Sequence, residues 1–478
     1  MLQASSFNLG SIAAAWLMKQ DGLLADDSST EPLKPELERM AFDLVPKQPH
    51  YPPQARAMIS MYMLGGPSQI DLFDPKPELV KRSGQDFPGD LKFDNPAQAS
   101  REILGPIWKF RHHGECGMEL SELVPQLGTV ADDITLIRSF HTGVNNHIQA
   151  NRAFNTGAIA SGRAALGSWL LSALGNESRE LPAYVALTHP RGLPLMGGDN
   201  WRNGGLPSIY QGTLVRPSEP RIFNLDPPRH LRGTPQAAQL SLLEQLNREH
   251  LDRHPAEHDL EARIASYGLA ARMQVAAREA FDLSQESKTT LEMYGIDQDV
   301  TRDYGSRCLI ARRLVERGVR FVQIFCEGQH WDHHGSIAKE LPERCVEIDK
   351  PAAALVKDLK QRGMLGSTLV HWGGEMGRLP VIQFRQGLTK REQIGRDHNT
   401  YGFSMWVAGG GMRSGHVHGS TDDFSHYAIE DIVNHHDWLA TILHLFGLDH
   451  KKMKFRVGPR ELKLVENTNA KVVQGLLA

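Results

Sequence analysis

Short apolar runs alternate along this chain with stretches of helical spacing, and this alternation constrains the fold more than any other feature. The strand-like runs are residues 56–64, 134–140, 182–187, 320–326, 368–372 and 401–408. The helical stretches are residues 120–131, 146–156, 307–317, 342–362 and 437–446. Strands that alternate with helices form βαβ units. We therefore predict an α/β fold with a mainly parallel sheet sandwiched between helices.

The composition fits a large folded protein without a nucleic-acid partner. The chain has 478 residues, of which 23% are charged and 40% are hydrophobic, as in ordinary globular proteins. Its net charge of −3 gives no electrostatic basis for binding nucleic acid. The four cysteines are far apart and include no CxxC pair. We expect them to be buried as small apolar side chains, with one or two disulfide bridges as the alternative.

We divide the chain into three parts. Residues 1–53 form a signal-like segment and linker, residues 54–465 form the α/β domain, and residues 466–478 form a C-terminal tail. Within the domain, residues 234–293 are rich in Leu, Ala, Glu, Gln and Arg, and Gly268 is their only glycine. This stretch is predicted to form two or three helices that leave the sheet, as a lid or an oligomer contact.

The N-terminal segment 7–18 is short, apolar and rich in small residues. It is too short to span a membrane. It is similar to the apolar region of a secretory signal, although no basic region precedes it. It is either an amphipathic first helix or part of a longer export signal. No other segment is apolar enough to span a bilayer, so an integral membrane protein is not expected.

Acidic and histidine residues recur where the strand-like runs begin or end. Binding sites form in the crevice beyond the carboxyl ends of parallel strands, so we expect these side chains to meet there. Carboxylates and imidazoles ligate zinc and other divalent metals. Two such ions would polarise a phosphoryl or sulfuryl oxygen and activate water. We predict one or two divalent ions, with Zn, Mn and Ca as candidates, held by Asp71, Asp332, His334, Glu375, Asp397 and His398.

These residues also have structural interpretations. Asp71 lies in a glycine-rich turn, where Asp commonly closes the backbone. Asp332 and His334 belong to a histidine-rich stretch that would also suit a surface loop. Asp397 and His398 would also suit a capping pair. The metal interpretation is favoured by the recurrence of the same residue types at several strand ends.

Several motifs, in order, resemble the bacterial domain-of-unknown-function family 1501. They are GGPSQIDLFDPKP at 65–77, WDHH at 331–334, GEMGR at 374–378, GRDH at 395–398, AGGG at 408–411 and ATILHLFGLDH at 440–450. The resemblance covers about residues 50–465. It implies a sulfatase-like fold of the alkaline phosphatase superfamily with a one- or two-metal site. Many members carry a twin-arginine export signal, and residues 2–7 are similar to the segment that follows the arginine pair.

The resemblance also implies roles for individual residues, and it shows departures. Met376 stands where the superfamily has a histidine ligand, which puts a second metal in doubt. The formylglycine-forming Cys-x-Pro-x-Arg run is missing, and the comparable helix begins at Asn146-His147. Thr142 and Ser139 are alternative nucleophiles, but neither starts that helix. Carried over, the metal ligands are Asp71, Asp332, His334, Glu375 and His398.

We assign Asn146 and His147 to catalysis through metal or substrate binding, with activated water as the attacking group. Three arginines lie near the predicted ligands in the sequence and are expected to bind an anionic ester through bidentate hydrogen bonds. Surface ion pairs are the alternative role for these arginines, which are Arg152, Arg378 and Arg396.

The predicted function is a metal-dependent hydrolase of phosphate or sulfate esters that works without a formylglycine nucleophile. The alternative is a catalytically inactive binding or assembly protein on the same fold. The expected partner is a small-molecule or polysaccharide anionic ester. An exported location, periplasmic or extracellular, is predicted, with the cytoplasm as the alternative. The oligomeric state is not predicted.

Overall fold

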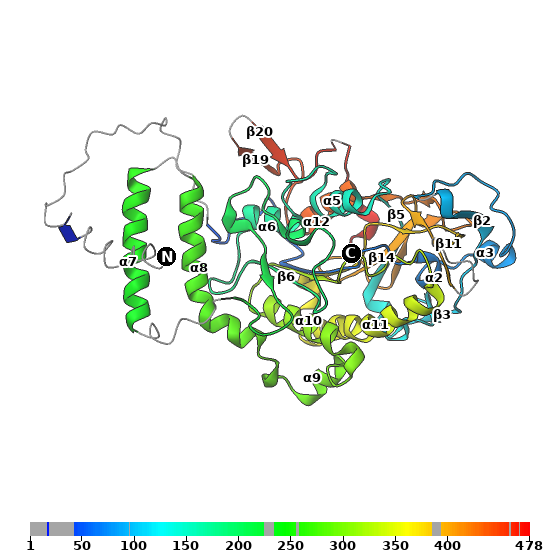
Figure 1. Cartoon of the computed structure of the whole chain (residues 1–478), viewed down its shortest axis with the longest axis horizontal. Helices are drawn as coiled ribbons and strands as arrows, with labels where there is room; N and C mark the ends of the chain where they lie inside the picture. Colours follow the sequence, from blue (N-terminus) through cyan, green and yellow to red (C-terminus); the bar gives the residue numbers. More distant parts are fainter. Residues whose placement is uncertain are drawn as a thin grey trace, which may run out of the picture.

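The computed structural model describes residues 17–18, 43–94, 96–223, 234–254, 258–384, 393–457, 460–467 and 469–478. Its centre is a nine-stranded sheet (Figure 1). The main strand order is β15 (His416–His418), β5 (Ile134–His141), β14 (Phe403–Ala408), β9 (Thr368–Gly373), β1 (Ala57–Tyr62), β8 (Phe321–Phe325), β6 (Tyr184–Leu187) and β7 (Thr213–Val215). β18 (Val433–Asn434) also pairs with β5.

All strands of this sheet except β14 run in the same direction. β1 pairs in parallel with both β8 and β9, and β6 continues the parallel pairing from β8 to β7. β14 lies antiparallel between β9 and β5. The predicted mainly parallel α/β sheet is therefore confirmed. Because β14 is reversed, the residues just before it lie at the edge where the other strands end.

Helices cover both faces of the sheet (Figure 1). They are α10 (Asp299–Glu316) and α11 (Ile337–Gln361) on one face, and α5 (His147–Thr156), α6 (Leu166–Leu174) and α12 (His435–Leu445) on the other. Successive strand residues point to opposite faces. Ile59 and Met61 of β1 therefore join one core, and Met58 and Tyr62 join the other. All residues of β1 are buried, as expected for a central strand with a helix layer on each side.

The stretch 120–131, predicted as one helix, is instead a strand followed by a single helical turn. β4 (Met118–Ser121) forms a hairpin with β3 (Phe110–His113), and α4 (Pro125–Gly128) comes next. The Asp349 carboxylate on α11 accepts hydrogen bonds from the first backbone N–H groups of α4, at 2.7 and 2.8 Å. The prediction was wrong because apolar residues from two short elements imitate one helical period.

Residues 234–293 leave the sheet as helices. α7 (Thr234–Arg253) and α8 (His258–Phe281) form a hairpin at one end of the molecule, and α9 (Lys288–Met293) follows (Figure 1). The C-terminal residues fold back onto the body, where Leu476 is buried and Leu477 forms a bridge to Met412.

Three of the four cysteines are buried, as predicted. Cys116 is exposed, and all four are free thiols, so the disulfide alternative is wrong. Of the signal-like segment 7–18, only Leu17 and Met18 belong to the described residues. Within the described parts of the chain, no helix combines the length and apolarity needed to cross a bilayer.

The loop after β1 passes very close to the loop after β8. Gly65 has a φ of +109°, and a Cβ placed there would lie 2.5 Å from the backbone nitrogen of Asp332. Both the positive φ and the close approach require glycine. Because the contact is to backbone atoms, no side-chain rotation can relieve it. Gly65 therefore sets the position of the Asp332 loop.

We expect Gly65→Ala to lower the free energy of unfolding by about 3 kcal/mol, since it combines a strained φ with a backbone clash. Urea denaturation measures this loss. Gly117→Ala is the matched control, because Gly117 has a φ of +67° and no heavy atom within 4 Å of its added Cβ. The control should lose about 1 kcal/mol. Equal losses in the two variants would show that the Gly65 contact is not tight.

Candidate metal centre

Four predicted side chains meet at the carboxyl edge of the sheet. Asp332 and His334 lie in the loop that follows β8, and His147 is the first residue of α5, which follows β5. His398 precedes the reversed strand β14, so it reaches the same edge from the opposite chain direction. The fold thus brings together His147 and His398, which are 251 positions apart in the sequence.

The three imidazoles converge on one carboxylate oxygen. The Nε2 atoms of His147, His334 and His398 lie 3.3, 2.9 and 3.3 Å from Oδ1 of Asp332. The four ligand atoms lie within 4.8 Å of one another. Ligand atoms at the corners of a tetrahedral zinc site, about 2.0–2.1 Å from the ion, are about 3.3–3.4 Å apart. The spacing therefore suits a small divalent ion after minor adjustment.

Each imidazole is held from behind by an acceptor. When Nδ1 donates to this acceptor, Nε2, the nitrogen that faces Asp332, can ligate an ion. Metal-ligating histidines are oriented in the same way by carboxylates, carbonyls and amides. The contacts are His147 Nδ1 to Glu375 Oε1 at 2.8 Å, His334 Nδ1 to Gln383 Oε1 at 2.6 Å, and His398 Nδ1 to the Asn145 carbonyl at 3.1 Å.

The electrostatics of the cluster favour a bound cation. Burial raises the pKa of Asp332, but the Arg378 guanidinium and the three imidazoles outweigh it and hold that pKa well below its usual range. Burial lowers the pKa of His147, yet its hydrogen bonds to Asp332 and Glu375 raise that pKa to about 9. Burial lowers the pKa of His398. A proton on His147 thus partly balances two carboxylates, and a divalent ion would take its place.

Glu375 lies behind His147 and away from the four ligand atoms. It is fully buried, and its Oε1 also accepts a hydrogen bond from the Gly65 backbone N–H at 3.0 Å. Its contact with His147 is to Nδ1, the nitrogen that does not face Asp332. The predicted ligand Glu375 is thus placed where it orients a ligand. Met376 is buried beside Gly66.

Arg378 and Arg396 are fully buried and committed to the scaffold. Arg378 donates to Asp332 Oδ1 at 2.7 Å, to the Gly66 carbonyl at 2.9 Å and to the Gly65 carbonyl. Arg396 forms a bidentate ion pair with Asp71, at 2.8 and 3.1 Å. These contacts tie the loops together. Neither guanidinium stands free for an ester.

Asp71 does not join the metal cluster. Besides Arg396, its carboxylate accepts hydrogen bonds from the Ser68 hydroxyl at 2.6 Å and the Ile107 backbone N–H at 3.1 Å. With these partners, Asp71 closes the turn after β1, which matches the structural interpretation of this residue.

Asp397 lies beside the cluster. It accepts hydrogen bonds from the backbone N–H groups of Asp94 and His398, at 3.0 and 2.8 Å. Asp94, Asp397 and His398 form a second group with metal-ligand spacing. This group would need Nδ1 of His398, which already faces the Asn145 carbonyl, so it fits an ion less well than the first group.

The start of α5 carries no free hydroxyl nucleophile. Asn146 is the N-cap, and its side chain accepts from the backbone N–H groups of Ile148 and Gln149. Thr142 donates its hydroxyl to the Glu375 carbonyl at 3.1 Å, and Ser139 donates to the Asp431 carbonyl at 2.7 Å. Arg152 is half-buried on α5, five residues after His147.

Sequence reasoning missed the groups behind two of the imidazoles. Gln383 lies on β11 (Val381–Phe384), and the Asn145 contact uses a backbone carbonyl. Neither could be found from residue type, because a glutamine within a strand-like run is common and a backbone oxygen has no sequence signature.

Comparisons with known proteins show the family to which the chain belongs. The family model described as "Protein of unknown function (DUF1501)" matches residues 55–477. A search of the curated proteins finds no match. Solved structures with a similar arrangement include a sulfatase from Pseudoalteromonas sp., which is 15% identical with a TM-score of 0.31 and covers 68% of this chain and 62% of that one.

Two further solved structures belong to the same group of neighbours. A lipoteichoic acid synthase from Listeria monocytogenes is 9% identical with a TM-score of 0.35. A phosphonate monoester hydrolase from Silicibacter pomeroyi is 10% identical with a TM-score of 0.33. Each of these two matches covers 89% of this chain and 76% of the other chain.

We expect Glu375→Ala to weaken metal binding by about 10- to 100-fold, because it removes the acceptor that orients His147. Glu375→Gln should weaken binding less, since its amide oxygen can still accept from Nδ1. Competition with a chromogenic chelator measures both affinities. Wild-type affinity in the alanine variant would contradict an orienting role for Glu375.

Proposed function

We propose that this chain, which belongs to the DUF1501 family of proteins of unknown function, binds one divalent transition-metal ion and hydrolyses phosphate or sulfate esters. The observation that carries the proposal is the convergence of three Nε2 atoms on Asp332, with each Nδ1 held by an acceptor. Three imidazoles around one carboxylate, with His147 and His398 buried and His334 partly exposed, form a donor set that suits a cation.

The chemistry of the donor atoms narrows the choice of ion. Imidazole nitrogen suits zinc and neighbouring transition metals, whereas calcium takes six to eight oxygen ligands. Of the predicted ions, zinc and manganese therefore fit three nitrogens and one carboxylate, and calcium does not. We place the ligands at His147, Asp332, His334 and His398. A single ion is proposed, because Glu375, Asp71 and Met376 do not complete a second site.

The ion would supply Lewis acidity and would lower the pKa of a water that it takes up in addition to the four side chains. The residues of this chain set the remaining conditions. Glu375 keeps His147 oriented, and Arg378 holds Asp332 through Oδ1. Because the start of α5 offers no hydroxyl or thiol, we propose that water attacks the ester directly and that no covalent enzyme intermediate forms.

The proposed substrate is a small-molecule or polysaccharide anionic ester, and the proposed location is outside the cytoplasm. Arg152 remains the candidate for contacting the ester, because Arg378 and Arg396 are occupied by the scaffold. The absence of a nucleic-acid partner rests on the net charge of −3.

A second candidate is a metal-stabilised binding or assembly protein without catalysis. Four protein ligands fill a tetrahedral site, and closed four-ligand sites are typical of structural zinc. In that case the ion would stabilise the folded state through its binding free energy, without taking part in a reaction.

Metal content and turnover together test both candidates. Wild-type protein should hold about one zinc or manganese ion per chain by elemental analysis. The Asp332→Ala/His334→Ala variant should hold none, because half of the ligand set is removed. His112→Ala, at an exposed histidine outside the cluster, is the control and should keep the ion.

The loaded protein is then assayed with p-nitrophenyl phosphate and p-nitrophenyl sulfate. Turnover that disappears in the double variant supports the hydrolase. A bound ion with no turnover, together with a fall of several degrees in melting temperature on chelation, supports the structural role. A wild-type chain that takes up no ion after supplementation overturns both candidates.

A further inference from the structure

The loop that follows β6, residues 188–200, is bonded to two segments that carry ligands of the candidate metal centre. We call it the β6 loop. On one side it pairs with the loop that presents Asp332. The Leu195 N–H donates to the Gly328 carbonyl at 3.1 Å, and the Gly328 N–H donates to the Leu193 carbonyl at 3.0 Å. Because Gly328 is only four positions before Asp332, the β6 loop is fixed to the Asp332 loop.

On its other side, the β6 loop is bonded to α5 through Asn200. The Asn200 Oδ1 accepts a hydrogen bond from the Asn151 side chain at 2.9 Å, and the Asn200 carbonyl accepts one from the Asn155 side chain. The Asn200 Nδ2 donates back to the carbonyls of Leu195 and Gly197, at 2.7 and 2.9 Å. Asn200 is fully buried, and its amide oxygen and nitrogen both have partners. Asn200 therefore joins the β6 loop to α5.

The residues of α5 that bind Asn200 lie on the same stripe of the helix as His147. Positions 147, 151 and 155 are four residues apart, so their side chains lie above one another on one face. At the start of this stripe, His147 contacts Asp332. Further along it, Asn155 also accepts a hydrogen bond from Gln323 of β8 at 3.3 Å. One face of α5 thus carries a metal ligand at its start and buried amide bonds behind it.

Hydrogen bonds fix the rotation of a helix more tightly than apolar packing does. Apolar contact is non-directional, whereas a hydrogen bond restricts both a distance and an angle. The outer atoms of a helix lie about 5–6 Å from its axis, so a rotation of about 10° would move the His147 imidazole by about 1 Å. Metal ligands must be held within about 0.5 Å of their working positions. A metal centre that uses His147 therefore requires α5 to be held against rotation.

We propose that the β6 loop holds α5 in register with the Asp332 loop, and that Asn200 is thereby a positioning residue of the metal centre. This role rests on the proposed function, because it takes His147 and Asp332 as ligands of one ion. Among the contacts that the structure describes, Asn200 touches neither ligand. It acts through Asn151 and Asn155 of α5.

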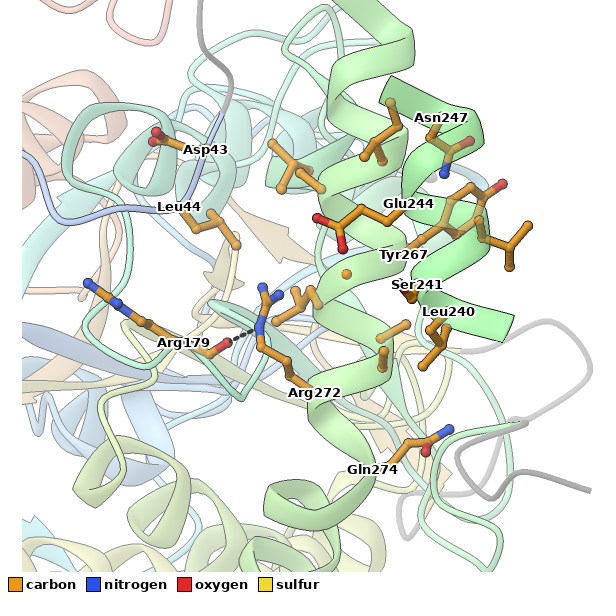
Figure 2. Close-up of a pocket in the computed structure, with 18 of the residues that line it drawn as sticks. Asp43, Leu44, Arg179, Leu240, Ser241, Glu244, Asn247, Tyr267, Arg272 and Gln274 are labelled. Carbon is orange, nitrogen blue, oxygen red and sulfur yellow. Dashed lines mark hydrogen bonds between the residues drawn. The ribbon is translucent and has the colours of Figure 1, made fainter. Parts of the chain in front are cut away.

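Asn176 is the matched control for Asn200. It is also fully buried, and its Nδ2 also donates to two backbone carbonyls, those of Ser178 and Leu181, at 2.8 and 3.4 Å. It precedes β6, so it lies toward the opposite edge of the sheet from the ligands. Ser178 and the adjacent Arg179 line a groove beside α8 (Figure 2). Removal of the Asn176 side chain should therefore destabilise the fold without moving α5.

Zinc affinity of the full chain, measured by competition with a chromogenic chelator, tests the proposal. Asn200→Ala should bind zinc about 10- to 100-fold more weakly than wild type, the usual effect of losing a group that supports a ligand. Asn176→Ala should bind within about twofold of wild type. The visible spectrum of the cobalt-loaded protein reports the ligand geometry, and it should change in Asn200→Ala alone. Equal zinc affinities in the two variants overturn the proposal.

Asn151→Ala provides the same test if Asn200→Ala does not fold. It removes one of the two bonds between α5 and Asn200 and leaves the bonds within the β6 loop intact. Its zinc affinity should fall by a smaller factor than in Asn200→Ala, but by more than in Asn176→Ala. An affinity equal to that of wild type overturns the proposal.

Hydrogen exchange of the ion-free chain, followed by mass spectrometry, separates this proposal from the proposed function. The amides of α5 should exchange at least about tenfold faster in Asn200→Ala than in wild type, because local opening becomes easier. Asn176→Ala should leave their exchange unchanged. Unchanged exchange of α5 in Asn200→Ala overturns the hold of the β6 loop on α5. Faster exchange in a chain whose wild type binds no ion supports that hold and overturns the metal centre.

Discussion

The candidate site depends on the contacts of the Asp332 carboxylate with one guanidinium and three imidazoles. A carboxylate that is largely removed from water, as Asp332 is, requires hydrogen bonds or charges in place of that water. Oδ1 of Asp332 contacts the Arg378 guanidinium and all three imidazoles. His334 belongs to the same loop as Asp332, but Arg378, His147 and His398 come from other segments, so the carboxylate joins parts of the chain that are far apart in sequence. The site is thus also a structural junction.

Buried arginines carry much of this junction. Arg378 bridges the β1 loop and the β8 loop through backbone carbonyls, and Arg396 binds Asp71 and the carbonyls of Leu104 and Gly105. A guanidinium suits this work, because its planar set of five donors satisfies several carbonyls at once. Arg378 and Arg396, which were predicted to bind the anionic ester, therefore hold loops in position. This arrangement explains how a rigid ligand cluster can be built from a loop, the first residue of a helix and a two-residue strand.

The strands were well predicted, because buried parallel strands are short apolar runs that differ clearly from their surroundings. The ranges 134–140, 320–326 and 368–372 coincide closely with β5, β8 and β9. The one failed helix, 120–131, lies where a hairpin strand and a single helical turn are adjacent. The ligand types at 332, 334 and 398 could be proposed from sequence, since carboxylate and imidazole after a strand are uncommon as plain core. The separation of Asp71 and Glu375 from the cluster could not be predicted from the sequence, because it depends on which partner each carboxylate contacts in the folded protein.

By itself, the sequence determined the α/β class, the helical excursion at 234–293 and the family resemblance, since all three follow from local periodicity and short motifs. Tertiary structure alone decided the membership of the cluster. His147 enters it because α5 starts at the edge where β8 ends, and His398 enters it because β14 runs in reverse. Asp71 is not part of the cluster, because its carboxylate forms an ion pair with Arg396 and not with an imidazole of the cluster. The physical reason is that ligation depends on distances of a few ångströms between residues hundreds of positions apart, and only the packing of the sheet sets those distances.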